Sequence, residues 1–255
     1  MKVMLFDGSM EELLCAVYRI YYDKVPPVLF RKEEYVPNLI DEPEDIHYNE
    51  EHFQKVRKSL REKMDQETMD NIAHALNHRS PDAPSTVLRY IITCFAAKKN
   101  RDDFQRKEIL DTVKMARQVG LESHRFLGFV RFSVIRDVYV SKIAPDHDIL
   151  EFIADHFVQR YSTQDFIIYD EIRAKAIISH QGEFIIRKDM ILDESLMRED
   201  AFTDYWKAYH EHTAIREREN PKAQKRSMPV RYWKNMVEAG KADEPSHKNG
   251  RKGPA

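Results

Sequence analysis

The side chains best suited to chemistry gather in Glu122 to Phe132, which reads E-S-H-R-F-L-G-F-V-R-F. One histidine and two arginines stand there among three phenylalanines. Side chains of an extended chain alternate between two faces, so a strand here would place Arg125, Phe129 and Arg131 on one face. Such a face can stack a base on its ring and hold phosphates with its guanidinium groups. The structural alternative is that the arginine stems cover a half-buried ring and pair with carboxylates elsewhere.

Further cations lie later in the chain and complete this predicted anion-binding surface. Arg160 lies on a predicted helix and Arg173 at a predicted strand end. The segment Met228 to Asn235, M-P-V-R-Y-W-K-N, interleaves aromatic rings with Arg231 and Lys234. We expect this segment to dock on the body of the protein, because its rings are large and apolar and Pro229 fixes the backbone. The second choice for the nucleic-acid face is the basic region around Lys225, Arg226 and Arg231.

Three residues are candidates for acid–base catalysis: His124, His156 and Asp170. Asp170 stands in Y-D-E-I-R, where it could orient a histidine, or bind an anion together with Arg173. The structural alternative is an ion-paired turn. The chain lacks the motifs of a nucleophile elbow, a phosphate loop and a zinc deaminase. Whether the protein is an enzyme therefore stays open, and no cofactor is predicted.

Metal chemistry is not predicted. His74 and His78 stand one helical turn apart, but no third ligand is evident in the sequence. Asp146-His147-Asp148 follows Pro145, and a Pro-Asp pair is typical of a helix N-terminal cap. The two cysteines, Cys15 and Cys94, lie in apolar helical patterns and are interpreted as core residues of a reducing compartment.

The overall charge limits how the chain can bind nucleic acid. The net charge of -2 over 255 residues argues against a protein that wraps nucleic acid through its overall charge. Local basic patches are still compatible with this net charge. No stretch approaches the roughly 20 apolar residues of a membrane span, and the start is broken by Asp7 too early for a signal peptide. We expect a cytoplasmic protein that does not contact membranes.

The elements that must position these residues fall into two regions. Residues 1–120 predict a mainly helical region, with a strand at Lys2 to Phe6, a capping box at Ser9 and Glu12, and helices from Asn49 onward. Ser85 is expected to cap a later helix, and Glu33 to Asp45 to form an acidic connection.

Residues 121–240 predict a mainly antiparallel sheet with a covering helix. Its elements are the strand 122–132, strands at 138–143, 166–169, 174–179 and 183–187, a helix starting at Pro145-Asp146, and a final packing helix at 199–218. Residues 241–255 are expected to form a flexible tail. The fold class is α+β, and the alternative to two regions is one integrated domain.

Arg125 to Phe132 also matches six of the eight positions of the RNA-recognition signature. The mismatches fall at Phe126 and Leu127, and no partner aromatic strand precedes the segment at a suitable spacing. The RNA-recognition fold is therefore rejected.

Several stretches in order along the chain resemble those of a bacterial family, DUF4130, described as DNA metabolism or repair proteins. They are F-D-G-S at 6–9, E-S-H-R-F-L-G-F-V-R-F at 122–132, I-A-P-D at 143–146, H-F-V-Q-R-Y at 156–161, I-I-Y-D-E-I-R at 167–173 and N-P-K-A-Q-K-R-S-M-P-V-R-Y-W-K-N-M at 220–236.

The resemblance implies which proteins the chain works with, but it does not imply a particular reaction. Members look like partners of a radical S-adenosylmethionine protein, and a similar domain is found fused to a uracil-DNA glycosylase-like domain. This chain lacks the three-cysteine cluster of a radical enzyme. The resemblance thus implies a DNA-repair accessory protein that binds DNA or a protein partner. A nuclease-like or base-processing enzyme and a purely structural scaffold are the alternatives.

Overall fold

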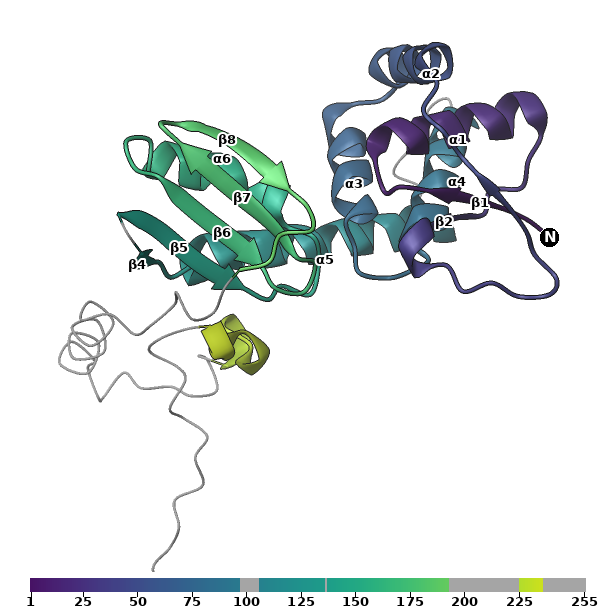
Figure 1. Ribbon diagram of the computed structural model, residues 1–255. Coiled ribbons are helices and arrows are strands. Elements are labelled where there is room, and N and C mark those ends of the chain that lie inside the picture. Colours follow the sequence, from purple (N-terminus) through teal and green to yellow (C-terminus); the bar gives the residue numbers. More distant parts are fainter. Residues whose placement is uncertain (97–105, 136, 193–224, 236–255) are drawn as a thin grey trace, which may run out of the picture. The chain divides into compact units, whose positions relative to one another are not determined.

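A computed structural model describes residues 1–96, 106–135, 137–192 and 225–235 of the protein (Figure 1). The chain divides into two compact units. The first comprises Met1–Ser123 and Asp146–Ile149, and the second comprises His124–Pro145 and the chain from Leu150 onward. The helix predicted at 199–218 and the tail predicted at 241–255 lie outside the described residues.

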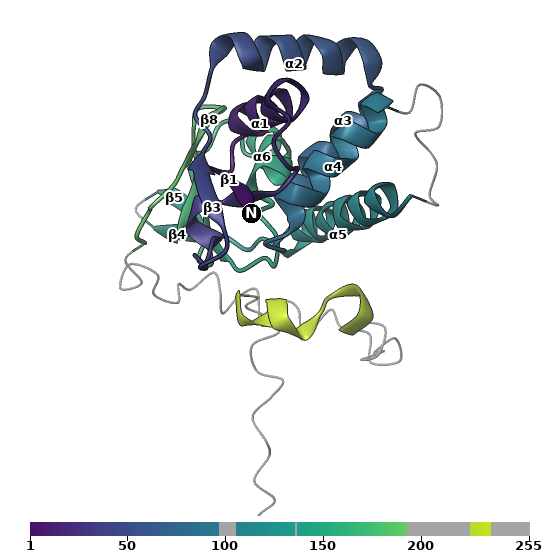
Figure 2. The ribbon, with the colours of Figure 1, turned by 90° about the vertical axis from the view of Figure 1, so that its right-hand side faces the viewer.

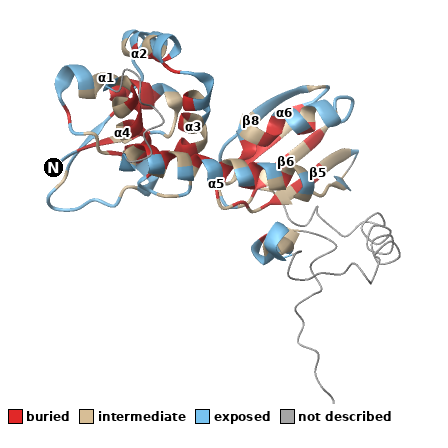
Figure 3. Cartoon of the chain, turned by 180° about the vertical axis from the view of Figure 1, so that it is seen from behind, coloured by how far each residue is buried: buried red, intermediate tan, exposed pale blue. Residues whose placement is uncertain are grey.

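The first unit combines helices with a small parallel sheet of order β2-β1-β3. Helix α2 packs on α1 (Figure 2). Buried residues are concentrated along α1 and α4 (Figure 3). The elements in chain order are β1 (Lys2–Phe6), α1 (Met10–Asp23), β2 (Leu29–Arg31), the 3-10 helix η1 (Lys32–Glu34), β3 (Glu42–Asp45), α2 (Glu50–Lys63), α3 (Gln66–Leu76), α4 (Ala83–Ala96) and α5 (Lys107–Phe129), which continues into the second unit.

Polar caps explain where the first helices begin. The Ser9 hydroxyl accepts from the Glu12 amide at 3.2 Å, as the capping box predicts, while the Glu12 carboxylate accepts from the Asp7 amide at 2.7 Å. Asn49 and Asp65 cap α2 and α3 through the amides three residues later. The predicted α+β class, with a helical N-terminal half, is confirmed.

The second unit is a five-stranded sheet of order β4-β5-β6-β7-β8. The strand pairs are antiparallel except β5–β6, where α6 provides the crossover that a parallel pair needs. Figure 1 shows α6 behind the sheet, and its buried residues include Ile153 and Phe157. The elements are β4 (Ser133–Ile135), β5 (Val138–Ile143), α6 (Leu150–Arg160), β6 (Phe166–Asp170), β7 (Lys175–His180), β8 (Glu183–Arg187) and the 3-10 helix η4 (Val230–Asn235).

The prediction of a strand over Glu122 to Phe132 is wrong, because α5 runs to Phe129. The buried positions continue a helical spacing of three and four residues into this segment: Ile109, Thr112, Ala116, Val119, Ser123, Phe126 and Val130. The burial of these side chains along one side of the helix outweighs the strand propensity of the phenylalanine-rich segment. Arg125 and Phe129 still share a side, now as helix neighbours four residues apart, whereas Arg131 lies beyond the helix.

Two further boundaries differ from prediction. Helix α6 begins at Leu150, so Asp146 lies in a loop and does not cap it. Ser85 lies inside α4, where its hydroxyl bonds both the amide and the carbonyl of Leu29 at 2.8 Å and so ties α4 to β2.

The acidic stretch predicted as a connection contains β3, which pairs with β1 although its four side chains are exposed. A strand without a buried face lacks the apolar alternation that would reveal it. None of the described helices is long and apolar enough to cross a membrane.

Candidate functional site

One side of α5 exposes cations and leucines at alternating intervals of three and four residues. The exposed residues in the first unit are Lys107, Leu110, Lys114, Arg117 and Leu121, with Gln118 beside them. We call these five regularly spaced residues the α5 stripe. No carboxylate of α5 belongs to the exposed set, since Glu108 and Asp111 are half-buried and Glu122 is buried.

The cations of the α5 stripe have no competing partners in the described part of the chain. Neither Lys107, Lys114 nor Arg117 forms an ion pair or hydrogen bond with another described residue. Their charges therefore face solvent, and no nearby carboxylate among those residues neutralises them. The sequence analysis did not predict this stripe. The spacing of Lys107, Lys114 and Arg117, seven and then three residues, is nevertheless that of one side of a helix.

The last turns of α5 belong to the second unit and carry the residues first predicted to bind anions. Arg125 is half-buried and has no ion pair within the described residues. Phe129 packs against Phe126 and Tyr232, with ring centroids 6.0 and 6.2 Å away. Arg131 instead donates to the backbone carbonyls of Gly128 and Val130, at 2.7 and 3.2 Å. The structure therefore separates the two arginines that the strand prediction had joined.

The C-terminal segment docks as predicted. Tyr232 of η4 is buried, with its ring centroid 5.0 Å from that of Phe126. The guanidinium of Arg231 lies 4.8 Å from the Tyr232 ring centroid. Lys234 pairs with Glu171 at 3.0 Å.

Glu171 accepts from two lysines, Lys142 at 2.8 Å and Lys234 at 3.0 Å. Burial opposes ionisation of Glu171, but these two hydrogen bonds outweigh it, and the pKa of Glu171 is lowered. Lys234 is thus engaged in fixing η4 to the sheet.

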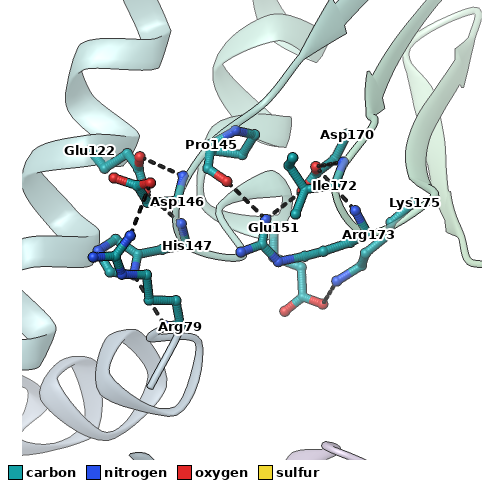
Figure 4. Close-up of polar contacts among 10 residues, drawn as sticks. All are labelled: Arg79, Glu122, Pro145, Asp146, His147, Glu151, Asp170, Ile172, Arg173 and Lys175. Carbon is teal, nitrogen blue, oxygen red and sulfur yellow. Dashed lines mark hydrogen bonds and ion pairs between the residues drawn. The ribbon is translucent and has the colours of Figure 1, made fainter. Parts of the chain in front are cut away.

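Asp170 is fully buried at the end of β6 and organises the turn that follows it (Figure 4). Its carboxylate accepts from the amides of Ile172 and Arg173, at 2.9 and 3.3 Å, and pairs with the Arg173 guanidinium at 2.8 Å. Arg173 also donates to the Pro145 carbonyl at 3.1 Å. This is the ion-paired turn, the structural alternative weighed for this segment.

The two histidines predicted as catalytic candidates, His124 and His156, do not form a site with Asp170 in the described part of the chain. Within the described residues, no hydrogen bond or ring contact links His124 to His156, and neither histidine contacts Asp170. His156 lies edge-on to Phe157 at 5.1 Å. Arg160 is exposed at the end of α6, without an ion pair in the described part of the chain.

A polar cluster in the first unit was missed by sequence reasoning. Buried Glu122 accepts from the Asp146 amide with Oε1 and from the His147 amide with Oε2, both at 2.8 Å (Figure 4). The Arg79 amide donates to His147 Nδ1 at 3.1 Å, and the Arg79 guanidinium pairs with Asp146 at 3.2 Å. This cluster holds the loop after β5 against α5 and the α3–α4 connection.

His78 lies against His147, with ring centroids 4.4 Å apart. Its Nδ1 accepts from the Ser80 amide at 3.1 Å, so its Nε2 donates to Gln118 at 2.8 Å. Burial lowers the pKa of His78, although the Gln118 bond opposes this. His74 bonds the Asp70 carbonyl instead. No group of three metal-binding side chains is found among the described residues.

Comparison with known proteins gives one match. A family model described as a domain of unknown function, DUF4130, matches residues 81–238. No curated protein and no solved structure matches the chain. The matched region begins at the α3–α4 connection and includes α5, the sheet and η4.

Proposed function

This chain belongs to the DUF4130 family, and from that premise we propose that it is a nucleic-acid-binding accessory protein of DNA metabolism or repair. In this proposal it binds nucleic acid through the α5 stripe and works with a radical S-adenosylmethionine partner. The observation that carries the proposal is the set of exposed cations on α5, which no other described residue pairs with and beside which α5 exposes no carboxylate.

The α5 stripe has the chemistry that phosphates require. Lys107 and Arg117 lie ten residues apart, a rise of about 15 Å along the helix, so the cations can contact several successive phosphates of one strand. The arginine fork suits phosphate oxygens, and lysine acts as a mobile point charge. With a net charge of -2 on the whole chain, binding would depend on this local patch and be strongly salt-dependent.

Taken by itself, the second unit offers Arg125 and Arg160 as the cations proposed to bind phosphate, because neither is engaged by another described residue. Phe129 lies four residues after Arg125 and so on the same helix side, while the Arg231 guanidinium lies over the Tyr232 ring. Arg173 and Lys234 are held by Asp170 and Glu171, so their proposed role is to stabilise the unit. The catalytic alternative through His124, His156 and Asp170 gains no support, because Asp170 is occupied by its own turn.

The experiment that tests the proposal is a fluorescence-anisotropy titration of labelled single-stranded and double-stranded DNA at two salt concentrations. The variant Lys114→Glu/Arg117→Glu should bind at least about tenfold more weakly, and its salt slope should fall by about 1.4–1.8, as expected for two lost phosphate contacts. The matched control is Lys55→Glu/Lys58→Glu on α2, which makes the same charge change at exposed lysines paired with Glu51 and Glu62. Equal losses in both variants would indicate a bulk charge effect and contradict a site on α5.

The partner proposal rests on the family resemblance. A tagged copy of the chain, purified gently from its native cells, should retain an iron–sulfur protein with a three-cysteine cluster. Recovery of a uracil-DNA glycosylase-like protein instead would place the chain in a different repair complex. Recovery of neither, under conditions that preserve other complexes, would contradict a stable partnership.

A further inference from the structure

Strand β8 forms one edge of the five-stranded sheet (Figure 1), and its side chains include exposed apolar ones. It reads E-F-I-I-R, and Phe184 and Ile185 are 37% and 62% exposed. An edge strand with consecutive exposed apolar residues is a template for pairing with another strand. Natural edges are usually blunted by lysine, proline or a bulge, but β8 itself contains neither lysine nor proline.

The hairpin geometry determines which backbone groups of β8 face outward. Gln181 and Gly182 form a two-residue turn with φ values of 49° and 82°, and His180 pairs with Glu183 across it. Because hydrogen-bonded and non-bonded positions alternate in an antiparallel pair, Glu183, Ile185 and Arg187 direct their backbone groups to β7. The amides and carbonyls of Phe184 and Ile186 therefore point to the open edge.

The chain that follows β8 does not fold over this edge before Met190. After Asp189, which has a φ of 54°, the Met190 amide donates to the Ala174 carbonyl at 2.8 Å, next to the start of β7. The chain therefore stays on the β7 side of β8 up to this residue.

The sequence of β8 is complementary to itself when two copies run antiparallel. With a two-fold axis at Ile185, Ile185 lies opposite Ile185 of the partner subunit, and Glu183 lies opposite Arg187 of the partner subunit. Phe184 then lies opposite Ile186 of the partner subunit, and these are the residues whose backbone groups face outward. We propose that β8 pairs in this register with β8 of a second copy of the chain, joining the two sheets into one.

The side chains on the sheet face support this register. Ile167 of β6 pairs with Ile178 of β7, which pairs with Ile185 of β8, so the three form a row across the sheet. The row lies on the face opposite to the fully buried Ile168 and Ile177. At the two-fold axis this row continues into its counterpart in the partner subunit. The axis can move only by whole residues, because outward-facing backbone groups must lie opposite each other. An axis at Phe184 would place Glu183 opposite Ile185 of the partner subunit and would lose both charge pairs.

A cysteine at the two-fold axis tests the proposal directly. Opposite residues have Cβ atoms about 4.5–5.5 Å apart, close to the distance that a disulfide spans, so Ile185→Cys should form a covalent dimer under mild oxidation. The native Cys15 and Cys94 are buried and should not interfere. The matched control is Val134→Cys on β4, the opposite edge strand, where Val134 is 43% exposed. Equal crosslinking at both edges would indicate random collision and overturn the proposal.

Light scattering across a concentration series then tests the charge pairs in the full chain. Arg187→Glu should raise the dimer dissociation constant about tenfold, because the symmetry replaces two attractive pairs by two repulsive ones. The swap Glu183→Arg/Arg187→Glu should restore dimerisation. Phe184→Pro should abolish it by removing an outward amide, whereas Phe184→Ala retains that amide. A wild-type chain that is monomeric at its solubility limit, or a dimer indifferent to these changes, would overturn the proposal.

Discussion

Two buried carboxyl groups, one in each unit, do the same work over very different chain distances. Glu122 accepts from amides 24 and 25 residues later in the sequence, whereas Asp170 accepts from amides two and three residues later. Both groups satisfy backbone donors that would otherwise lack partners away from water. These two buried carboxylates hold the backbone of a loop and of a turn in place, whereas the cations of the α5 stripe are exposed.

The largest effect is expected from Glu122→Ala, which leaves the loop amides of Asp146 and His147 without their acceptor. The variant should lower the free energy of unfolding by about 4 kcal/mol, because each unsatisfied buried donor costs about 1–3 kcal/mol. Urea unfolding followed by circular dichroism measures the loss. Arg79→Ala is the control, because it removes an ion pair whose arginine is 63% exposed and should cost less than about 1 kcal/mol. Equal costs would show that Glu122 does not hold the loop.

Asp170→Ala should cost somewhat less, about 3 kcal/mol, by the same urea measurement. The turn is local, and the Arg173 guanidinium keeps its bond to the Pro145 carbonyl. Asp170→Asn, which retains an acceptor for the two amides, should recover a substantial part of that loss. If Asp170→Ala is neutral for stability but abolishes a measurable activity, the carboxylate is catalytic and this assignment fails.

Much of the second unit could be predicted because its signals are local. The turn at Gln181-Gly182 and the strands on either side are confirmed, since alternating apolar residues and a turn glycine lie within a few residues of each other. The ion-paired turn of Asp170 was likewise one of two interpretations available from Y-D-E-I-R alone.

The Glu122 cluster could not be predicted, because its partners are distant in sequence and its helix was mistaken for a strand. The aromatic residues of F-L-G-F-V-R-F have strand propensity, and only the burial of Phe126 in line with Val119 and Ser123 reveals the helix. Strand β3 was missed for a related reason, since E-P-E-D buries no side chain.

Glu171→Gln should have a smaller effect, about 1 kcal/mol, because Lys142 and Lys234 lose their charged acceptor. The pKa of Glu171 is lowered in the folded chain, so its contribution is present above the unfolded pKa and is lost as the pH falls through the folded pKa. Wild-type stability should therefore decline more steeply than that of Glu171→Gln as the pH falls below about 4.5. Parallel pH profiles of the two proteins would contradict this.

The smallest expected effect is the pH response of His78. Burial lowers its pKa in the folded chain, so the unfolded chain takes up the proton first as the pH falls. The stabilising contribution is present above the unfolded pKa of about 6.5 and is lost as the pH falls toward the lowered folded value. Between about pH 7 and 5, His78→Gln should show a flatter stability profile than wild type in thermal melts. An unchanged slope would mean that another group titrates there.

We propose that Glu122 stabilises the fold and that the cations of the α5 stripe bind DNA. The most direct test measures DNA affinity and melting temperature on one variant of each kind. Lys114→Glu/Arg117→Glu should bind DNA at least about tenfold more weakly with an unchanged melting temperature. Glu122→Gln should melt at a lower temperature but, at a temperature where it is folded, bind DNA as wild type does. Wild-type affinity in the Lys114→Glu/Arg117→Glu variant would contradict the account.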